Sequence, residues 1–110
     1  MAVHDGMTGS RGESGASALQ RALSAESAAN LGRLGRAVQR ALAGLRGIPE
    51  DQTAAREDAE YACAEAVWYY FVQREACGLA RHDSVIETYE IPAPVLAKVG
   101  ARRPAALKRT

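Results

Sequence analysis

The clearest pattern along the chain is a stripe of apolar residues at helical spacing in its first half. Between residues 16 and 46, leucines and one valine recur in steps of three, four and eight, which is typical of one face of an α-helix. The stripe consists of Leu19, Leu23, Leu31, Leu34, Val38, Leu42 and Leu45. At about 100 degrees per residue, Arg33, Arg36 and Arg40 fall on the opposite side. The pattern predicts a long amphipathic helix with a basic outer face.

A second long helix is predicted after a short turn. Gly47 suits the C-terminal cap of the first helix, and Pro49 cannot continue it. The second helix should run from about Asp51 to Ala76 or Cys77. Because two long helices joined by so short a turn fold back on each other, we expect an antiparallel hairpin.

The segment after Gly78 predicts shorter elements. Ser84 and Glu87 have the spacing of a capping box at the start of a third helix. Pro92 then interrupts the chain, and a last short helix should end near Gly100. The expected fold is therefore all-α, a long helical hairpin capped by one or two short C-terminal helices.

The two ends of the chain lack this periodicity. Residues 1–15 are rich in glycine and serine and contain no apolar run, so they resemble neither a signal peptide nor a membrane span. Residues 101–110 are basic. We expect both ends to be disordered tails around one helical domain, residues 16–100, of a cytoplasmic protein.

An aromatic run in the second helix, AVWYYFV, is the main candidate for a binding surface. Seven residues make about two helical turns, so these side chains point in all directions and one partner helix covers only one side. The candidate interface residues are Val67, Trp68, Tyr69, Tyr70, Phe71 and Val72. We expect a second copy of the chain to cover part of them, giving a homodimer. The alternatives are the chain's own C-terminal segment and an unknown partner protein. A stacking pocket for a cofactor or small molecule is the alternative, but the helix is acidic, and we expect no cofactor.

Two glycines inside the first helix, Gly32 and Gly35, each cost about 1 kcal/mol relative to alanine. We interpret them as helix-packing positions, where a small residue lets another helix come close. The alternative is that a long helix simply tolerates them.

No complete catalytic or metal-binding motif is present. Glu75 has no histidine, serine or metal ligand at a spacing that would make it a general base. Cys77 could join His82 and Asp83 in a metal site, but the chain has no CxxC and no HExxH. We therefore expect no enzyme. On one helix Cys63 would lie about 21 Å from Cys77, which is too far for a disulfide, so we expect two buried free thiols.

Charge is segregated along the chain. The net charge is +4 over residues 16–47, −7 over residues 48–91 and +5 over residues 92–110. The alternative function is therefore nucleic-acid binding by the arginine face of the first helix together with the basic C-terminal residues. The C-terminal candidates are Lys98, Arg102, Arg103, Lys108 and Arg109. Membrane binding is not expected, because the apolar face of the first helix is leucine and alanine without tryptophan or phenylalanine.

Three segments, LGRLGRAVQRAL, VWYYFVQREACGL and RHDSVIETYEIPAPVLAKVG, resemble a small bacterial family of proteins of unknown function. The resemblance covers residues 16–100. It implies a small helical fold and brings no activity, cofactor or catalytic residue. The sequence thus predicts a non-enzymatic, homo-oligomeric interaction or scaffold protein.

Overall fold

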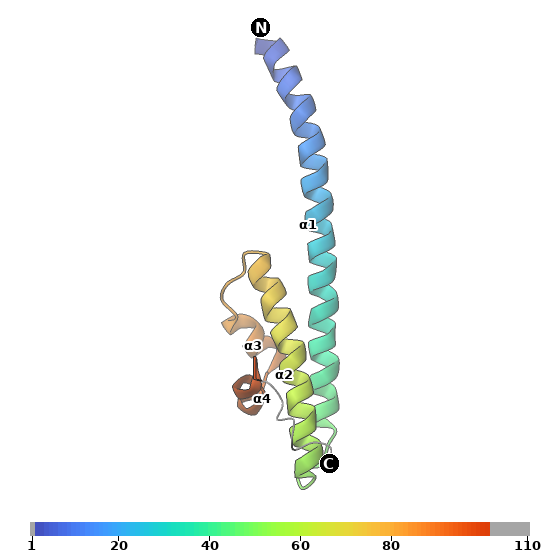
Figure 1. The fold of residues 1–110 in the computed structure, drawn as a ribbon, viewed down its shortest axis with the longest axis vertical. Helices are drawn as coiled ribbons and strands as arrows, with labels where there is room; N and C mark the ends of the chain where they lie inside the picture. Colours follow the sequence, from blue (N-terminus) through green and yellow to red (C-terminus); the bar gives the residue numbers. More distant parts are fainter. Residues whose placement is uncertain (1, 102–110) are drawn as a thin grey trace. The chain divides into compact units, whose positions relative to one another are not determined.

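The computed structural model describes residues 2–101, and their side chains from residue 15 onward. Four helices are present (Figure 1): α1 (Ala2–Arg46), α2 (Thr53–Ala76), α3 (Asp83–Tyr89) and α4 (Ala93–Lys98). The described part of the chain contains no β-strand. The prediction of an all-α fold with a long first helix and short C-terminal helices is confirmed. The described residues divide into two compact units, one up to residue 30 and one from residue 31 to residue 101.

The first unit consists of the N-terminal part of α1. The helix begins at Ala2 and not at the expected Ala16. No proline precedes Pro49, so no residue of this segment lacks the backbone N–H that helical hydrogen bonds use. From Gly15 to Asn30 nearly all side chains are exposed, including Leu19 (62%) and Leu23 (55%).

The core of the second unit lies between α1 and α2, which run side by side in opposite directions (Figure 1). The apolar stripe of α1 supplies one side of this core, as the sequence predicts. The buried hydrophobic residues of this core are Val38, Leu42 and Leu45 of α1, Cys63, Ala64, Val67 and Tyr70 of α2, then Ile91, and Val95 of α4.

The turn between α1 and α2 is held by an arginine that the sequence pattern did not single out. The Arg56 guanidinium donates hydrogen bonds to the carbonyl oxygens of Leu45 (3.3 Å) and Ile48 (2.7 Å). Gly47 N–H also donates to Ala43 O at 3.2 Å. Arg56 therefore satisfies the Ile48 carbonyl of the turn and gives a second donor to Leu45 O, which already accepts from Ile48 N–H at 3.1 Å.

The start of α3 differs from the expectation. The N-cap residue is His82, and Ser84 lies inside the helix. No side-chain hydrogen bond caps the start of α3. The capping-box prediction is wrong because the loop after Gly78 fixes the position of His82, as described below.

The end of α3 is held by α1. Glu90 closes the helix in the left-handed region at φ 54. The Arg46 guanidinium donates to the carbonyl oxygens of Tyr89 and Glu90, each at 3.0 Å. Pro92 then caps α4, and Gly100 follows that helix with φ +81.

Candidate functional site

The aromatic run of α2 is divided between the core and the surface. Val67 and Tyr70 are buried within the chain itself. Trp68 is 43% exposed, Tyr69 50% and Val72 44%. The chain's own helices therefore cover one side of the run and leave the other side open.

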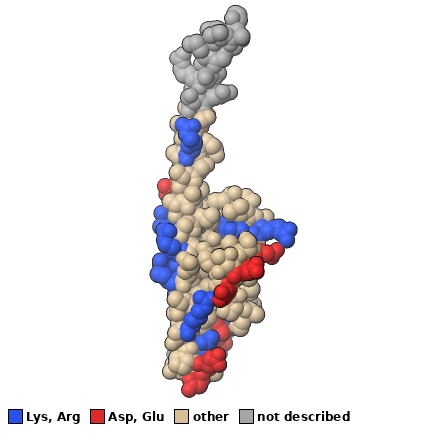
Figure 2. Space-filling model, turned by 180° about the vertical axis from the view of Figure 1, so that it is seen from behind, with Lys and Arg blue, Asp and Glu red and all other residues tan. Residues whose placement is uncertain are grey.

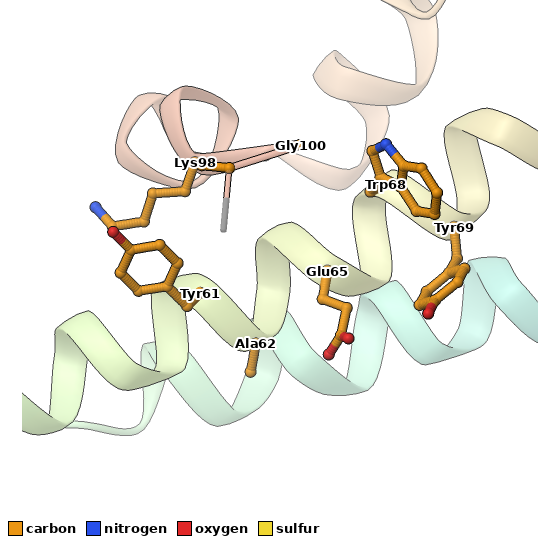
Figure 3. A pocket seen from close by; sticks show the side chains of 8 residues that line it. Tyr61, Ala62, Glu65, Trp68, Tyr69, Lys98 and Gly100 are labelled. Carbon is orange, nitrogen blue, oxygen red and sulfur yellow. The ribbon is translucent and has the colours of Figure 1, made fainter. Parts of the chain in front are cut away.

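The open side contains a pocket of about 530 Å³ between α2 and the end of α4 (Figure 3). Its walls are Tyr61, Ala62, Glu65, Trp68, Tyr69, Lys98, Gly100 and Ala101. The α2 residues among them follow one helical face at steps of about three and four. That spacing is visible in the sequence, but the prediction treated the aromatic residues as one continuous run and did not include Tyr61 and Glu65.

The two charged residues of the pocket differ in their partners. Lys98 Nζ lies 3.1 Å from Glu60 Oε1 and 5.3 Å from the centre of the Tyr61 ring. Among the described residues, no ion pair or side-chain hydrogen bond forms at Glu65. Within the part of the chain that the structure describes, the pocket charge without a partner is therefore the Glu65 carboxylate.

Trp68 and Tyr69 form a corner of the pocket. Their ring centres are 5.1 Å apart and their planes meet at 75°. A Cβ added at Gly100 would lie 3.8 Å from Cδ1 of Trp68, so the backbone after α4 borders the indole. The two rings present walls in different directions.

The His82 ring contacts Arg74 and Glu75, two charged residues at the end of α2. Arg74 Nε donates to Nδ1 at 3.0 Å, so the proton is on Nε2, which is 2.9 Å from Glu75 Oε2. The ring also stacks on Phe71, with centres 4.0 Å apart. Sequence spacing places no histidine beside Glu75, but the loop after Gly78 turns back along α2 and brings His82 to it. Both ring nitrogens are engaged, so His82 holds this loop against α2.

The described residues contain no cluster of three metal-ligating side chains. Cys63 is buried, as expected, but Cys77 is exposed, which corrects the prediction of two buried thiols. Gln73 Nε2 lies 3.6 Å from the Cys77 sulfur. Burial raises the pKa of the Cys63 thiol above its usual value, an effect that the nearby Arg46 partly offsets.

These environments predict different thiol reactivities. In the folded protein at neutral pH, one thiol per chain, Cys77, should react with a disulfide reagent, and Cys63 should react only after unfolding. Spectrophotometric titration of thiols with and without denaturant measures this. Rapid reaction of two thiols in the native protein, or a Cys77→Ser variant that still reacts, would contradict the placement of Cys63.

Gly35 is a close-packing position and Gly32 is not. A Cβ at Gly35 would lie 3.0 Å from the Tyr89 hydroxyl and 3.4 Å from Cε1 of Tyr70. At Gly32, the one described atom within 4 Å is Nη1 of Arg36 in the same helix, so no other helix comes close there. A hydrogen bond to Tyr70, together with burial, raises the pKa of the Tyr89 hydroxyl.

The arginine face of α1 is exposed. Arg33, Arg36 and Arg40 are all accessible, and Figure 2 shows basic side chains in a row along this helix. Lys98, the first of the C-terminal candidates, is paired with Glu60. The other four, Arg102, Arg103, Lys108 and Arg109, lie outside the described residues, as does the predicted C-terminal tail apart from Ala101.

Helices of the described region are all too short or too polar to cross a membrane.

Comparisons with known proteins identify a family but no activity. Neither the curated proteins nor the solved structures gave a match. A family model described as a family of unknown function, DUF6665, matches residues 3–106. The helical fold, the aromatic pocket and the arginine face described above are therefore features of a chain that belongs to the family of unknown function DUF6665.

Proposed function

We propose that the protein is a homodimeric interaction module that pairs through the N-terminal part of α1. The observation that carries this proposal is the exposure of Leu19 and Leu23, at 62% and 55%. They belong to the same apolar stripe that, farther along α1, forms the core with α2.

The free energy of helix formation supports a partner for this segment. An isolated helix is marginal in water, and most helical stability in proteins comes from packing of an apolar face. Full burial of a leucine side chain is worth about 1.5–3 kcal/mol. A helix that keeps two leucines in water gives up this stabilisation.

A second copy of the chain is the partner that fits best. Both copies bring the same stripe, so one two-fold symmetric contact covers both. Residues 16–30 carry one positive charge, Arg21, and one negative charge, Glu26, so two copies do not repel each other in this region. The surrounding alanines and serines allow close approach of the two helices.

The aromatic run of α2 suits a dimer contact less well. Val67 and Tyr70 already serve the core of their own chain. Glu65 lies on the open face beside Trp68 and Tyr69 (Figure 3), and burying an unpaired carboxylate against apolar surface is costly. We therefore place self-association on α1.

The proposal predicts a dimer that resists salt. Sedimentation equilibrium should give about 23 kDa, twice the 11.7 kDa of one chain, in low and in high salt alike. Salt screens charges but does not weaken contacts between leucines. A mass near 12 kDa at all concentrations, or dimers that dissociate as salt rises, would refute it.

Nucleic-acid binding is the second candidate, favoured by the exposed row of Arg33, Arg36 and Arg40. Binding through phosphate contacts weakens steeply with salt and shows little dependence on sequence. The same salt series with added duplex DNA separates the two functions, because a DNA complex should dissociate under conditions in which the dimer persists.

A further inference from the structure

We propose that the pocket between α2 and α4 is a binding site for an organic cation, an alkylated ammonium or a guanidinium group. Cations of this class have a weakly hydrated charge and bind to the faces of aromatic rings. This inference is independent of self-association through α1.

The walls of the pocket have the chemistry of a cation site. Trp68 and Tyr69, about half exposed, present two ring surfaces at 75° to each other. Glu65 lies one turn earlier on the same face of α2, and Figure 3 shows it between Tyr61 at one end and this aromatic corner at the other. Two aromatic rings and a carboxylate therefore line one pocket of about 530 Å³.

The cation already present does not occupy this corner. The Lys98 ammonium is held by Glu60 at 3.1 Å and lies over the Tyr61 ring at 5.3 Å. Its charge is thus matched by Glu60 and leaves Glu65 unmatched. The contact with Tyr61 also shows that one wall of the pocket accommodates an ammonium group over a ring.

The surroundings add negative potential. A neighbouring groove is lined by Glu50, Glu57 and Glu60 together with two cations, Arg56 and Lys98. Lys98 pairs with Glu60, and Arg56 keeps its charge while donating to backbone carbonyls, so the three carboxylates and two cations of the groove leave one net negative charge. A positively charged ligand is therefore attracted to this side of α2.

The chain's single tryptophan, Trp68, reports directly on the pocket. Choline is the probe, and its neutral isostere 3,3-dimethyl-1-butanol is the control, with sodium chloride at matched concentration as the blank. The tryptophan fluorescence of the full-length protein should change saturably with choline. The neutral isostere should bind at least several-fold more weakly, because it lacks the charge.

The choline affinities of three variants test which side chains contribute to binding. Glu65→Gln keeps the size of the side chain and should weaken choline binding about three- to tenfold. Tyr69→Leu should weaken it comparably without weakening binding of the neutral isostere. Glu87→Gln, an exposed carboxylate of α3 outside the pocket, should leave the affinity unchanged. Far-UV circular dichroism checks that each variant is folded.

The cation can come from two sources. One is a ligand from outside the chain. The other is the chain's own Arg102 and Arg103, which directly follow the pocket residue Ala101 in the sequence. Choline should bind more tightly to an Arg102→Ala/Arg103→Ala variant if these arginines compete for the site, and equally tightly if the ligand comes from outside. The proposal is overturned if choline gives no saturable change, if the isostere binds as well, or if folded Glu65→Gln and Tyr69→Leu both bind choline like the wild type.

Discussion

Leu42→Ala should lower the free energy of unfolding by about 2–5 kcal/mol. The Leu42 side chain is 1% exposed and lies in the core shared by α1, α2 and α4. Its truncation removes apolar burial and leaves a cavity, because neighbouring side chains relax only in part. For a small domain stabilised by about 5–15 kcal/mol, this is a large fraction of the total. Urea unfolding followed by circular dichroism, at one fixed protein concentration, measures the shift in midpoint.

The matched control is Leu79→Ala, the same chemical change at a side chain that is 43% exposed. We expect less than about 1 kcal/mol there, as for most surface substitutions. Equal losses at the two positions would mean that Leu42 is not a core residue and that the packing of α1 on α2 is described incorrectly.

Leu19→Glu combined with Leu23→Glu should convert the dimer into a monomer. The two leucines of each copy place four side chains in the proposed contact, each worth about 1.5–3 kcal/mol when fully buried. Loss of even two of them, with four carboxylates introduced, should raise the dissociation constant more than about a hundredfold. Light scattering over a concentration series measures that constant.

The matched control for this variant places the same charges on the other side of the helix. Ala25 and Ala28 are exposed and lie on the side of α1 away from Leu19 and Leu23, at about 100 degrees per residue. Ala25→Glu with Ala28→Glu should therefore leave the dimer intact. A dimer lost equally in both pairs would point to helix disruption by charge and not to a leucine contact.

The long helices could be predicted from sequence because their signals are local and repeated. The stripe through Val38, Leu42 and Leu45 is buried as expected, and α2 ends at Ala76, within the predicted range. Gly35 was also identified, since a glycine that costs helix stability usually has a packing reason. Here that reason is the Tyr89 hydroxyl and the Tyr70 ring, which lie 3.0 Å and 3.4 Å from where a Cβ would stand.

Contacts made across loops could not be predicted in the same way. His82 sits between Arg74 and Glu75 only because the chain reverses after Gly78, and this contact moves the start of α3 away from the capping-box position. Arg56 reaches the carbonyls at the end of α1 across the hairpin turn. No periodicity encodes either contact, because each depends on the three-dimensional path of the backbone.

The pocket is intermediate between these cases. The face that carries Tyr61, Glu65, Trp68 and Tyr69 follows from helical spacing, so its composition is readable from the sequence. The depth of the pocket cannot be read from the sequence, because Lys98 and Gly100 at the end of α4 form its opposite wall. The aromatic run thus combines two roles, core on one side of α2 and an open site on the other.

The central claim, self-association through the N-terminal part of α1, is tested most directly by measuring three masses side by side with light scattering at one protein concentration. The wild type and the Ala25→Glu/Ala28→Glu variant should both give about 23 kDa, and the Leu19→Glu/Leu23→Glu variant about 12 kDa, one or two copies of the 11.7 kDa chain. A monomeric wild type, or a leucine variant that remains dimeric while folded, would contradict the claim.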